Sequence, residues 1–158
     1  MKKRYIIMII LLVLIDQLSK FFVVSNFNVY DEWIIIKDFF KFEYVQNTGI
    51  SFGLFSGGRV LIIIASIAVI GFMIYDMFQE ESKIHYFSCM LILSGAIGNL
   101  IDRVIRGYVV DFISFTFWGH KMAIFNIADI CVVIGVILYI LLMFVEGRSK
   151  DEEDSSEE

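Results

Sequence analysis

The sequence has no proline and little cysteine or histidine. It contains two cysteines and two histidines in 158 residues. Without proline, a helix in this chain has to end at glycine or at polar residues. Cys89 and Cys131 fall within apolar runs and match no disulfide or metal framework, so we expect both to pack between helices. His85 and His120 are isolated and lack the spacing of a zinc site, so we expect no metal and no cofactor.

Charge is also scarce outside one short segment. Charged residues make up 20% of the chain, and no basic patch with interleaved aromatic residues is present, which argues against nucleic acid as a partner. The formal net charge of -5 owes much to the stretch Asp151–Glu158. We therefore predict that residues 147–158 form an acidic, disordered cytoplasmic tail.

Apolar residues dominate what remains. The chain is 58% hydrophobic and 16% aromatic, which is typical of a membrane protein. A helix that spans a bilayer needs about 20 mostly apolar residues. The segments that meet this requirement are residues 5–24, 60–78, 84–101 and 124–145. We predict a single membrane domain over residues 1–146, all-α apart from a small β element.

The first segment indicates the orientation of the chain. Three cations precede it, as in a secretory signal, but its apolar run is long, holds Asp16 and Lys20, and has no small-residue cleavage site. We therefore expect a retained helix with a cytoplasmic N-terminus, so that four spans return the C-terminus to the cytoplasm. The connections 25–59 and 102–123 would then lie outside.

The outer connections contain patterns typical of strands. Trp33–Ile36 is a short apolar run, and Phe39–Val45 mixes aromatic residues with charges in loose alternation. Tyr108–Thr116 has a similar composition, whereas Gln46–Gly53 is rich in turn residues. We predict a small extracytoplasmic sheet at the membrane surface, with its aromatic side chains at headgroup level.

Three aspartates stand out against the apolar background. Asp102, Asp111 and Asp129 lie between residues 95 and 129, in surroundings apolar enough for a bilayer. Ionised carboxylates at membrane depth are costly and usually mark a functional site. Two aspartates that share one proton can act as acid and base, the ionised one activating water and the protonated one polarising a carbonyl. Such a pair hydrolyses a peptide bond without metal.

Amides accompany two of these aspartates at helical spacing. Asn99 precedes Asp102 by three residues, and Asn126 precedes Asp129 by three. We expect each amide to orient the carboxylate that shares its helix face, although Asn126 could instead cap a helix. Arg103, next to Asp102, would hold that carboxylate in a supporting role.

Other polar residues leave alternatives open. Asp16 and Lys20 share one helix face towards the bundle interior, either as a local ion pair or as direct substrate contacts. The three aspartates could also form a site for a hard cation such as magnesium. Ser51 could act as a nucleophile only if Lys20 reached it.

Five motifs in order resemble those of the lipoprotein signal peptidases (signal peptidase II), the bacterial intramembrane aspartyl proteases. They are Asp16–Lys20, Asn47–Gly53, Gly98–Arg103, Val109–Phe112 and Phe125–Asp129. The resemblance covers nearly the whole chain apart from the acidic tail. Ile50-Ser51 and Ile130-Cys131 depart from the family's usual residues at those positions, which affects fine specificity rather than the carboxylates.

The resemblance implies both an activity and a site. The family removes the signal peptide of diacylglyceryl-modified prolipoproteins on the amino side of the lipidated cysteine, and it is the target of globomycin. Four helices and a small sheet that cradles the substrate are implied, in the bacterial cytoplasmic membrane. By motif, Asp111 and Asp129 would form the catalytic dyad, with no metal or other cofactor. The site support would be Asp16, Lys20, Asn47, Gly49, Asn99, Asp102, Arg103 and Asn126. The partners would be prolipoproteins and membrane lipid, and the protein would be a monomer.

Three other functions fit parts of the pattern. Buried aspartates and asparagines also line ion paths, so a small proton- or ion-coupled transporter is the alternative from another class. The N-x-x-D repeat gives it weak support as a sign of internal symmetry. A non-catalytic assembly factor would tolerate loss of Asp111, and a metal-dependent hydrolase would be sensitive to chelators.

Overall fold

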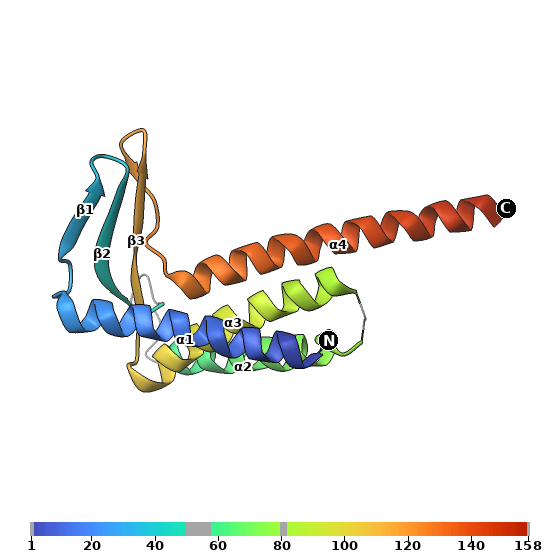
Figure 1. Ribbon diagram of the computed structural model, residues 1–158, viewed down its shortest axis with the longest axis horizontal. Helices are drawn as coiled ribbons and strands as arrows, with labels where there is room; N and C mark the ends of the chain where they lie inside the picture. Colours follow the sequence, from blue (N-terminus) through green and yellow to red (C-terminus); the bar gives the residue numbers. More distant parts are fainter. Residues whose placement is uncertain (1, 50–57, 80–81, 158) are drawn as a thin grey trace.

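A computed structural model describes residues 2–49, 58–79 and 82–157. Within these ranges the chain forms four long helices and a four-stranded sheet (Figure 1). The helices are α1 (Lys2–Asn26), α2 (Gly58–Met77), α3 (Lys83–Ile105) and α4 (Ile127–Glu157). The strands are β1 (Glu32–Ile36), β2 (Phe40–Asn47), β3 (Val109–Phe117) and β4 (His120–Lys121). The predicted fold class is confirmed.

Helix α3 lies at the centre of the helical bundle. About two thirds of its apolar window, 67%, is buried, against 17% for α1, 11% for α2 and 17% for α4. All four described helices are long and apolar enough to cross a membrane. The outer three expose large apolar side chains such as Leu18, Leu61 and Phe144. A bilayer would cover these faces, because lipid is as apolar as the side chains themselves.

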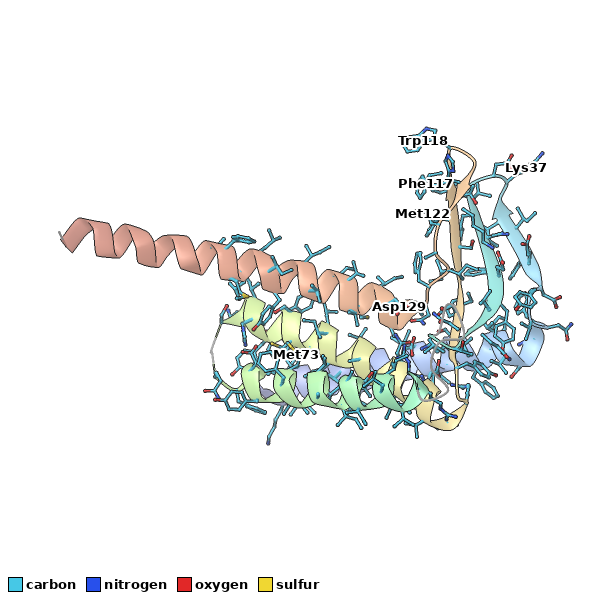
Figure 2. All side chains as sticks on the ribbon, turned by 180° about the vertical axis from the view of Figure 1, so that it is seen from behind. Lys37, Met73, Phe117, Trp118, Met122 and Asp129 are labelled. Carbon is cyan, nitrogen blue, oxygen red and sulfur yellow. The ribbon has the colours of Figure 1, made fainter. Side chains whose placement is uncertain are left out.

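The sheet stands across one end of the bundle, with its strands running roughly perpendicular to the helices (Figures 1 and 2). Its strands are antiparallel in the order β1-β2-β3-β4, and the predicted strands are confirmed. An apolar cluster joins the sheet to the last turn of α1, where Val23 packs with Tyr44, Val110 and Phe112. If the helices cross a membrane, this geometry lays the sheet along the membrane surface.

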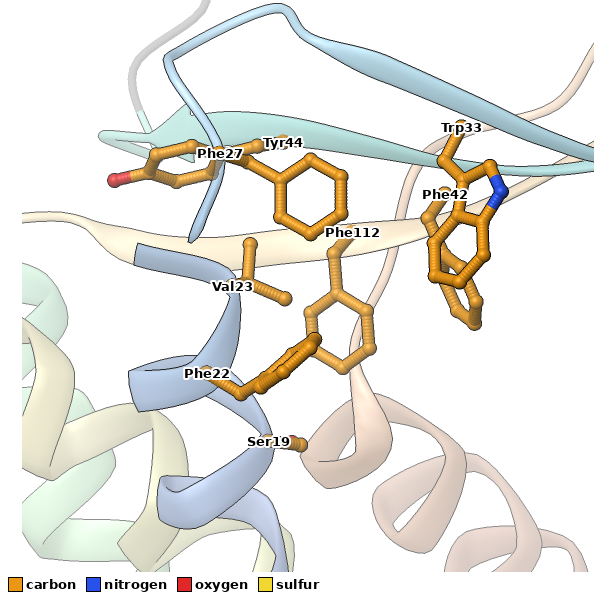
Figure 3. A pocket seen from close by; sticks show the side chains of 8 residues that line it. All are labelled: Ser19, Phe22, Val23, Phe27, Trp33, Phe42, Tyr44 and Phe112. Carbon is orange, nitrogen blue, oxygen red and sulfur yellow. The ribbon is translucent and has the colours of Figure 1, made fainter. Parts of the chain in front are cut away.

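A cavity of about 220 Å³ lies between the end of α1 and the sheet (Figure 3). Its lining is almost wholly apolar and comprises Ser19, Phe22, Val23, Phe27, Trp33, Phe42, Tyr44 and Phe112. Phe112 and Asp111 are neighbours on β3, and successive side chains of a strand point to opposite faces. The cavity is therefore on the face of β3 opposite to Asp111.

The C-terminal segment differs from its prediction. We expected residues 147–158 to be disordered, whereas the structure continues α4 through Glu157. The helix can continue because no proline occurs and no glycine follows Gly147. The predicted departure at Ile50-Ser51 lies outside the described residues, as does Ser51 as a candidate nucleophile.

Candidate active site

Two glycines of α3 allow this helix to pack closely against α4 and α1 at the level of the aspartates. A Cβ added to Gly95 would lie 2.2 Å from the carbonyl oxygen of Ala128, and one added to Gly98 would lie 2.6 Å from a carboxylate oxygen of Asp16. Both distances are shorter than atoms allow, so only glycine permits this approach. The close packing places the first turn of α4 against the polar part of α3.

Lys20 occupies the buried centre of the polar cluster. Its side chain is 0% exposed, and its Nζ lies 2.8 Å from Asp16 and 3.1 Å from Asp102. It also donates a hydrogen bond to Oδ1 of Asn99 at 3.0 Å. The predicted ion pair between Asp16 and Lys20 is present and faces the bundle interior, which favours support over direct contact with substrate. Pairing of this kind is what makes charges tolerable away from water.

Asp102 is held by cations other than the predicted one. It is fully buried, and its described ion pairs are with Lys20 and with Arg106, one turn further along α3. Arg103 instead donates to the carbonyl oxygen of Asn99. The prediction that Arg103 holds Asp102 was wrong, because adjacent residues of a helix point in different directions whereas residues four apart share a face. The backbone N–H of Val110 also donates to Asp102, which ties the start of β3 to α3.

The side chain of Asp111 on β3 is buried and is hydrogen-bonded by two amide side chains. Its side chain accepts one hydrogen bond from Asn47 on the neighbouring strand β2, at 2.8 Å, and one from Asn126 at 2.7 Å. Burial raises the pKa of Asp111 to about 6. The Asn47 hydrogen bond opposes this rise, and the negative charge of Asp129 adds to it. The two carboxylates are thus electrostatically coupled.

Asp129 is positioned by the start of α4. Asn126 precedes the helix, and its Oδ1 accepts from the backbone N–H of Asp129 at 2.9 Å, while Asp129 accepts from the backbone N–H of Asn126 at 3.1 Å. This reciprocal pair is a capping box. The predicted cap at Asn126 is confirmed. Because α4 begins at Ile127, Asp129 lies in its first turn and takes part in the same cap.

The amides connect carboxylates on different elements. Asn99 on α3 donates to Asp129 at 2.8 Å, and Asn126 donates to both Asp111 and Asn99. We expected each amide to serve the aspartate of its own helix face. That holds for Asn126 through the cap but not for Asn99, whose described carboxylate partner is Asp129. The result is a continuous chain of hydrogen bonds from Asp111 to Asp129 through Asn126.

A cleft beside Asp111 connects this cluster with the surface. It has a volume of about 360 Å³ and is lined by Val45, Gln46, Asn47, Thr48, Gly49, Asp111, Ala123 and Ile124. Gly49 shapes its rim, because the backbone N–H of Gly49 donates to Oδ1 of Asn47 at 2.8 Å with a φ of 72°. That backbone conformation favours glycine. The turn fixes Asn47 so that its other amide atom reaches Asp111.

The three aspartates do not form the cation site considered from the sequence. Both oxygens of Asp102 are used by Lys20, Gln17, Arg106 and a backbone N–H. Among the described residues, the cluster with suitable spacing for a metal is a different one, Asp76, His85 and Cys89. His85 is therefore not isolated, contrary to the prediction. Its partners are Asp76 on α2 and Cys89 one turn further along α3. The pairing with Asp76 joins two helices, so the spacing of residues within one helix does not predict it.

Comparison with known proteins shows the family of this chain. A family model described as "Signal peptidase (SPase) II" matches residues 8–145. A protein of Clostridium tetani named lipoprotein signal peptidase is 38% identical over 151 residues, covering 94% of this chain and 97% of the relative. A protein of Clostridioides difficile with the same name is 41% identical, covering 92% of this chain and 99% of the relative.

Solved structures show the same architecture. One, described as a bacterial membrane enzyme at 2.3 Å resolution, has a TM-score of 0.85 and 30% identity, covering 94% of this chain and 92% of that chain. A second, described in the same way at 1.9 Å resolution, has a TM-score of 0.84 and 31% identity, covering 89% of this chain and 92% of that chain.

Proposed function

The chain belongs to the signal peptidase II family, and from this membership we propose that it removes the signal peptide from diacylglyceryl-modified prolipoproteins, with Asp111 and Asp129 as its catalytic dyad. The observation that carries the proposal is the hydrogen-bonded chain from Asp111 through Asn126 to Asp129. Asp111 lines the cleft, and Asp129 is half-buried at the start of α4. The polar groups of the site come from one chain, so the protein can act as a monomer.

The dyad can hydrolyse a peptide bond by dividing acid and base roles. One aspartate accepts a proton from water while the other donates a proton to the oxygen of the scissile carbonyl. Attack by the water gives a tetrahedral diol. As the diol collapses, the aspartate that took the proton from water gives it to the nitrogen, a hydroxyl proton of the diol returns to the other aspartate, and the carbon–nitrogen bond breaks to release the amine of the lipidated cysteine. The new carboxyl group belongs to the signal peptide. No metal or other cofactor is needed for these steps.

We assign the shared proton to Asp111. Its side chain is 2% exposed, and burial together with the charge of Asp129 raises the pKa of Asp111. Asp129 accepts hydrogen bonds from Asn99 and from the backbone N–H of Asn126. Asp129 lies in the first turn of α4, where the helix dipole favours negative charge. Asp129 is therefore the base that activates water, and Asp111 is the acid towards the carbonyl.

The remaining site residues support these two carboxylates. Lys20 forms ion pairs with Asp16 and Asp102 and so offsets the negative charge of these two buried carboxylates. Asn47 and Gly49 form the rim of the cleft, in which an extended peptide can lie beside Asp111. Arg103 adds a cation on α3 that Asp102 does not engage, and we assign it to substrate carbonyl or headgroup oxygens.

The proposed orientation has the sheet and dyad at the extracytoplasmic face. The N-terminus, the last turn of α2 and the first turn of α3 lie at the opposite end of the bundle from the sheet (Figure 1). The cations Lys2, Lys3 and Arg4 favour the cytoplasmic side for that end, which also puts the C-terminus there. The protein would thus meet prolipoproteins after their signal helix has entered the cytoplasmic membrane. A transporter is not favoured, because the relatives are peptidases by name.

The activity is tested with a matched pair of substrates. One prolipoprotein carries diacylglycerol on its cysteine and the other carries an unmodified cysteine, and each is incubated with purified protein in lipid. The proposal expects release of the signal peptide from the modified substrate and cleavage on the amino side of the cysteine. Equal cleavage of both substrates would contradict the dependence on lipid, and cleavage of neither would contradict the function.

A further inference from the structure

A second cluster of titratable groups lies at the end of the bundle remote from the sheet. Asp76 is in the last turn of α2, His85 is in the first turn of α3, and Cys89 follows one turn later on the same face of α3. Met73, labelled in Figure 2, lies one turn before Asp76. None of these residues has a part in the proposed cleavage, which takes place at the other end of the helices.

The three ligand atoms approach one another closely. Sγ of Cys89 lies 3.6 Å from Oδ2 of Asp76 and 3.5 Å from Nε2 of His85, and that nitrogen lies 3.2 Å from Oδ2 of Asp76. Sulfur, nitrogen and oxygen thus form a triangle with sides of 3.2 to 3.6 Å. Each of the three residue types is a recognised ligand of zinc.

This triangle matches one face of a zinc tetrahedron. With metal–ligand bonds of about 2.3 Å to sulfur and about 2.0 to 2.2 Å to nitrogen and oxygen, tetrahedral angles put sulfur about 3.5 to 3.6 Å from the other two ligands. They put nitrogen about 3.3 Å from oxygen. The observed separations of 3.6, 3.5 and 3.2 Å agree with these values. A metal could therefore enter with little movement of the ligands.

The surroundings also suit a metal site. Cys89 is 0% and His85 4% exposed, whereas the side chain of Asp76 retains 19% exposure, which leaves a way in from that side. Tyr139 on α4 donates a hydrogen bond to Oδ2 of Asp76 at 3.0 Å. Hydrogen bonds of this kind orient carboxylate ligands in metal sites. The backbone carbonyl of Asp76 lies 3.1 Å from Nε2 of His85 and, like water, is a candidate fourth ligand.

We propose that Asp76, His85 and Cys89 form a binding site for Zn²⁺ that fastens α2 to α3 at the end of the bundle opposite the sheet. The metal would replace the hydrogen bonds among these three side chains with bonds to one ion. Binding to the folded chain stabilises it by mass action. The site departs from our expectation that neither the histidines nor the cysteines bind metal, and it is independent of the cleavage proposal.

The test uses the full chain, purified under reducing conditions and freed of metal by a chelator. Zn²⁺ is titrated calorimetrically, and Co²⁺ serves as a spectroscopic probe because a thiolate–cobalt bond gives a charge-transfer band in the near ultraviolet. We expect one equivalent of Zn²⁺ per chain, the Co²⁺ band, and a rise in Tm with Zn²⁺. A wild-type protein that binds neither metal overturns the proposal, whatever the variants do.

Matched variants locate the metal. Cys89→Ser and His85→Gln should each abolish the Co²⁺ band, and Tyr139→Phe should weaken Zn²⁺ affinity by about 10-fold or more. Cys131→Ser is the control, because Cys131 packs against Met90 and Leu91 rather than in the cluster, and its band should match wild type. A band that persists in Cys89→Ser or disappears in Cys131→Ser contradicts the assignment. A cooperative thermal transition of metal-free Cys89→Ser, like that of the metal-free wild type, shows that this variant folds.

Discussion

Asp16 and Ala128 are 112 positions apart in sequence, yet Oδ1 of Asp16 accepts a hydrogen bond from the backbone N–H of Ala128 at 3.0 Å. Ala128 lies in the first turn of α4, where backbone N–H groups have no partner within the helix. A carboxylate from α1 thus completes the start of the helix that carries Asp129. The same carboxylate pairs with Lys20, so α1 positions the end of α4 that carries Asp129.

Loss of this contact should reduce stability and activity together. Asp16→Ala removes one partner of a buried ion pair, which costs about 3 to 5 kcal/mol in comparable cases. The free energy of unfolding in detergent and the cleavage rate should both fall. The control is Glu32→Gln, which breaks a more exposed ion pair with Lys41 and should cost at most about 1 kcal/mol. A stable, fully active Asp16→Ala variant would contradict the supporting role of Asp16.

The close approach of α3 and α4 predicts opposite effects at two glycines. In Gly98→Ala the new methyl group would meet Asp16 at 2.6 Å and Ala128 at 3.3 Å, so Tm and activity should both drop. Gly71→Ala on α2 is the matched control, because nothing lies within 4 Å of its added Cβ. Alanine should stabilise that helix by about 0.5 to 1 kcal/mol. The measurement is the thermal unfolding of both variants. Equal changes in Tm at the two sites would contradict the close packing at Gly98.

The partner of Asp102 can be tested on stability alone. Arg106→Met removes a cation from a fully buried carboxylate, and we expect a loss of about 2 kcal/mol. Arg103→Met should cost less, because Arg103 donates only to a backbone carbonyl at 3.4 Å in the described contacts. Urea-induced unfolding in mixed micelles gives both values. A larger loss at Arg103 than at Arg106 would restore the pairing we first predicted.

The raised pKa of Asp111 predicts a pH dependence with a definite sign. Asp111 has to be protonated to act as the acid, so kcat/KM should fall as pH rises through about 6, the value that burial gives this carboxyl in the free enzyme. Bound substrate excludes more water, which favours the neutral form, so the fall in kcat should come at higher pH.

Asn47 provides the matched change. Its hydrogen bond favours ionised Asp111 and lowers the pKa, so Asn47→Ala should move the fall in kcat/KM to higher pH. Asn28→Ala removes an exposed amide that contacts Asp31, and it should leave the profile unchanged. A shift to lower pH in Asn47→Ala would contradict the assignment of the proton to Asp111.

Much of the fold could be predicted because its signals are local. Apolar runs located the four helices to within a few residues at every end except the C-terminal end of α4. Trp33–Ile36 and Phe39–Val45 located β1 and β2. The end of α4 was not predicted, because an acidic, polar composition indicates disorder although its residues are compatible with a helix. Composition indicates whether a segment is exposed to water, but it does not indicate whether a preceding helix continues into that segment.

The site was predictable in its members but not in its connections. The costly aspartates and their amides could be named from the sequence, whereas Asn99 turned out to serve Asp129 across two helices. Likewise, Asp102 pairs with Arg106 rather than its neighbour. The cluster of Asp76, His85 and Cys89 combines side chains from two helices. Such pairings depend on how the helices and strands pack against one another. The periodicity of apolar residues and the spacing within one element therefore do not predict them.

The most direct measurement is cleavage of a diacylglyceryl-modified prolipoprotein by Asp111→Asn and Asp129→Asn, each confirmed as folded by its thermal transition. The control is Asp38→Asn, an exposed turn residue with a φ of 57° that asparagine also tolerates. The dyad predicts that both site variants lose at least about 100-fold in kcat, the lower bound for removing general acid or base catalysis, and that Asp38→Asn cleaves like wild type. Wild-type cleavage by either Asp111→Asn or Asp129→Asn would contradict the dyad.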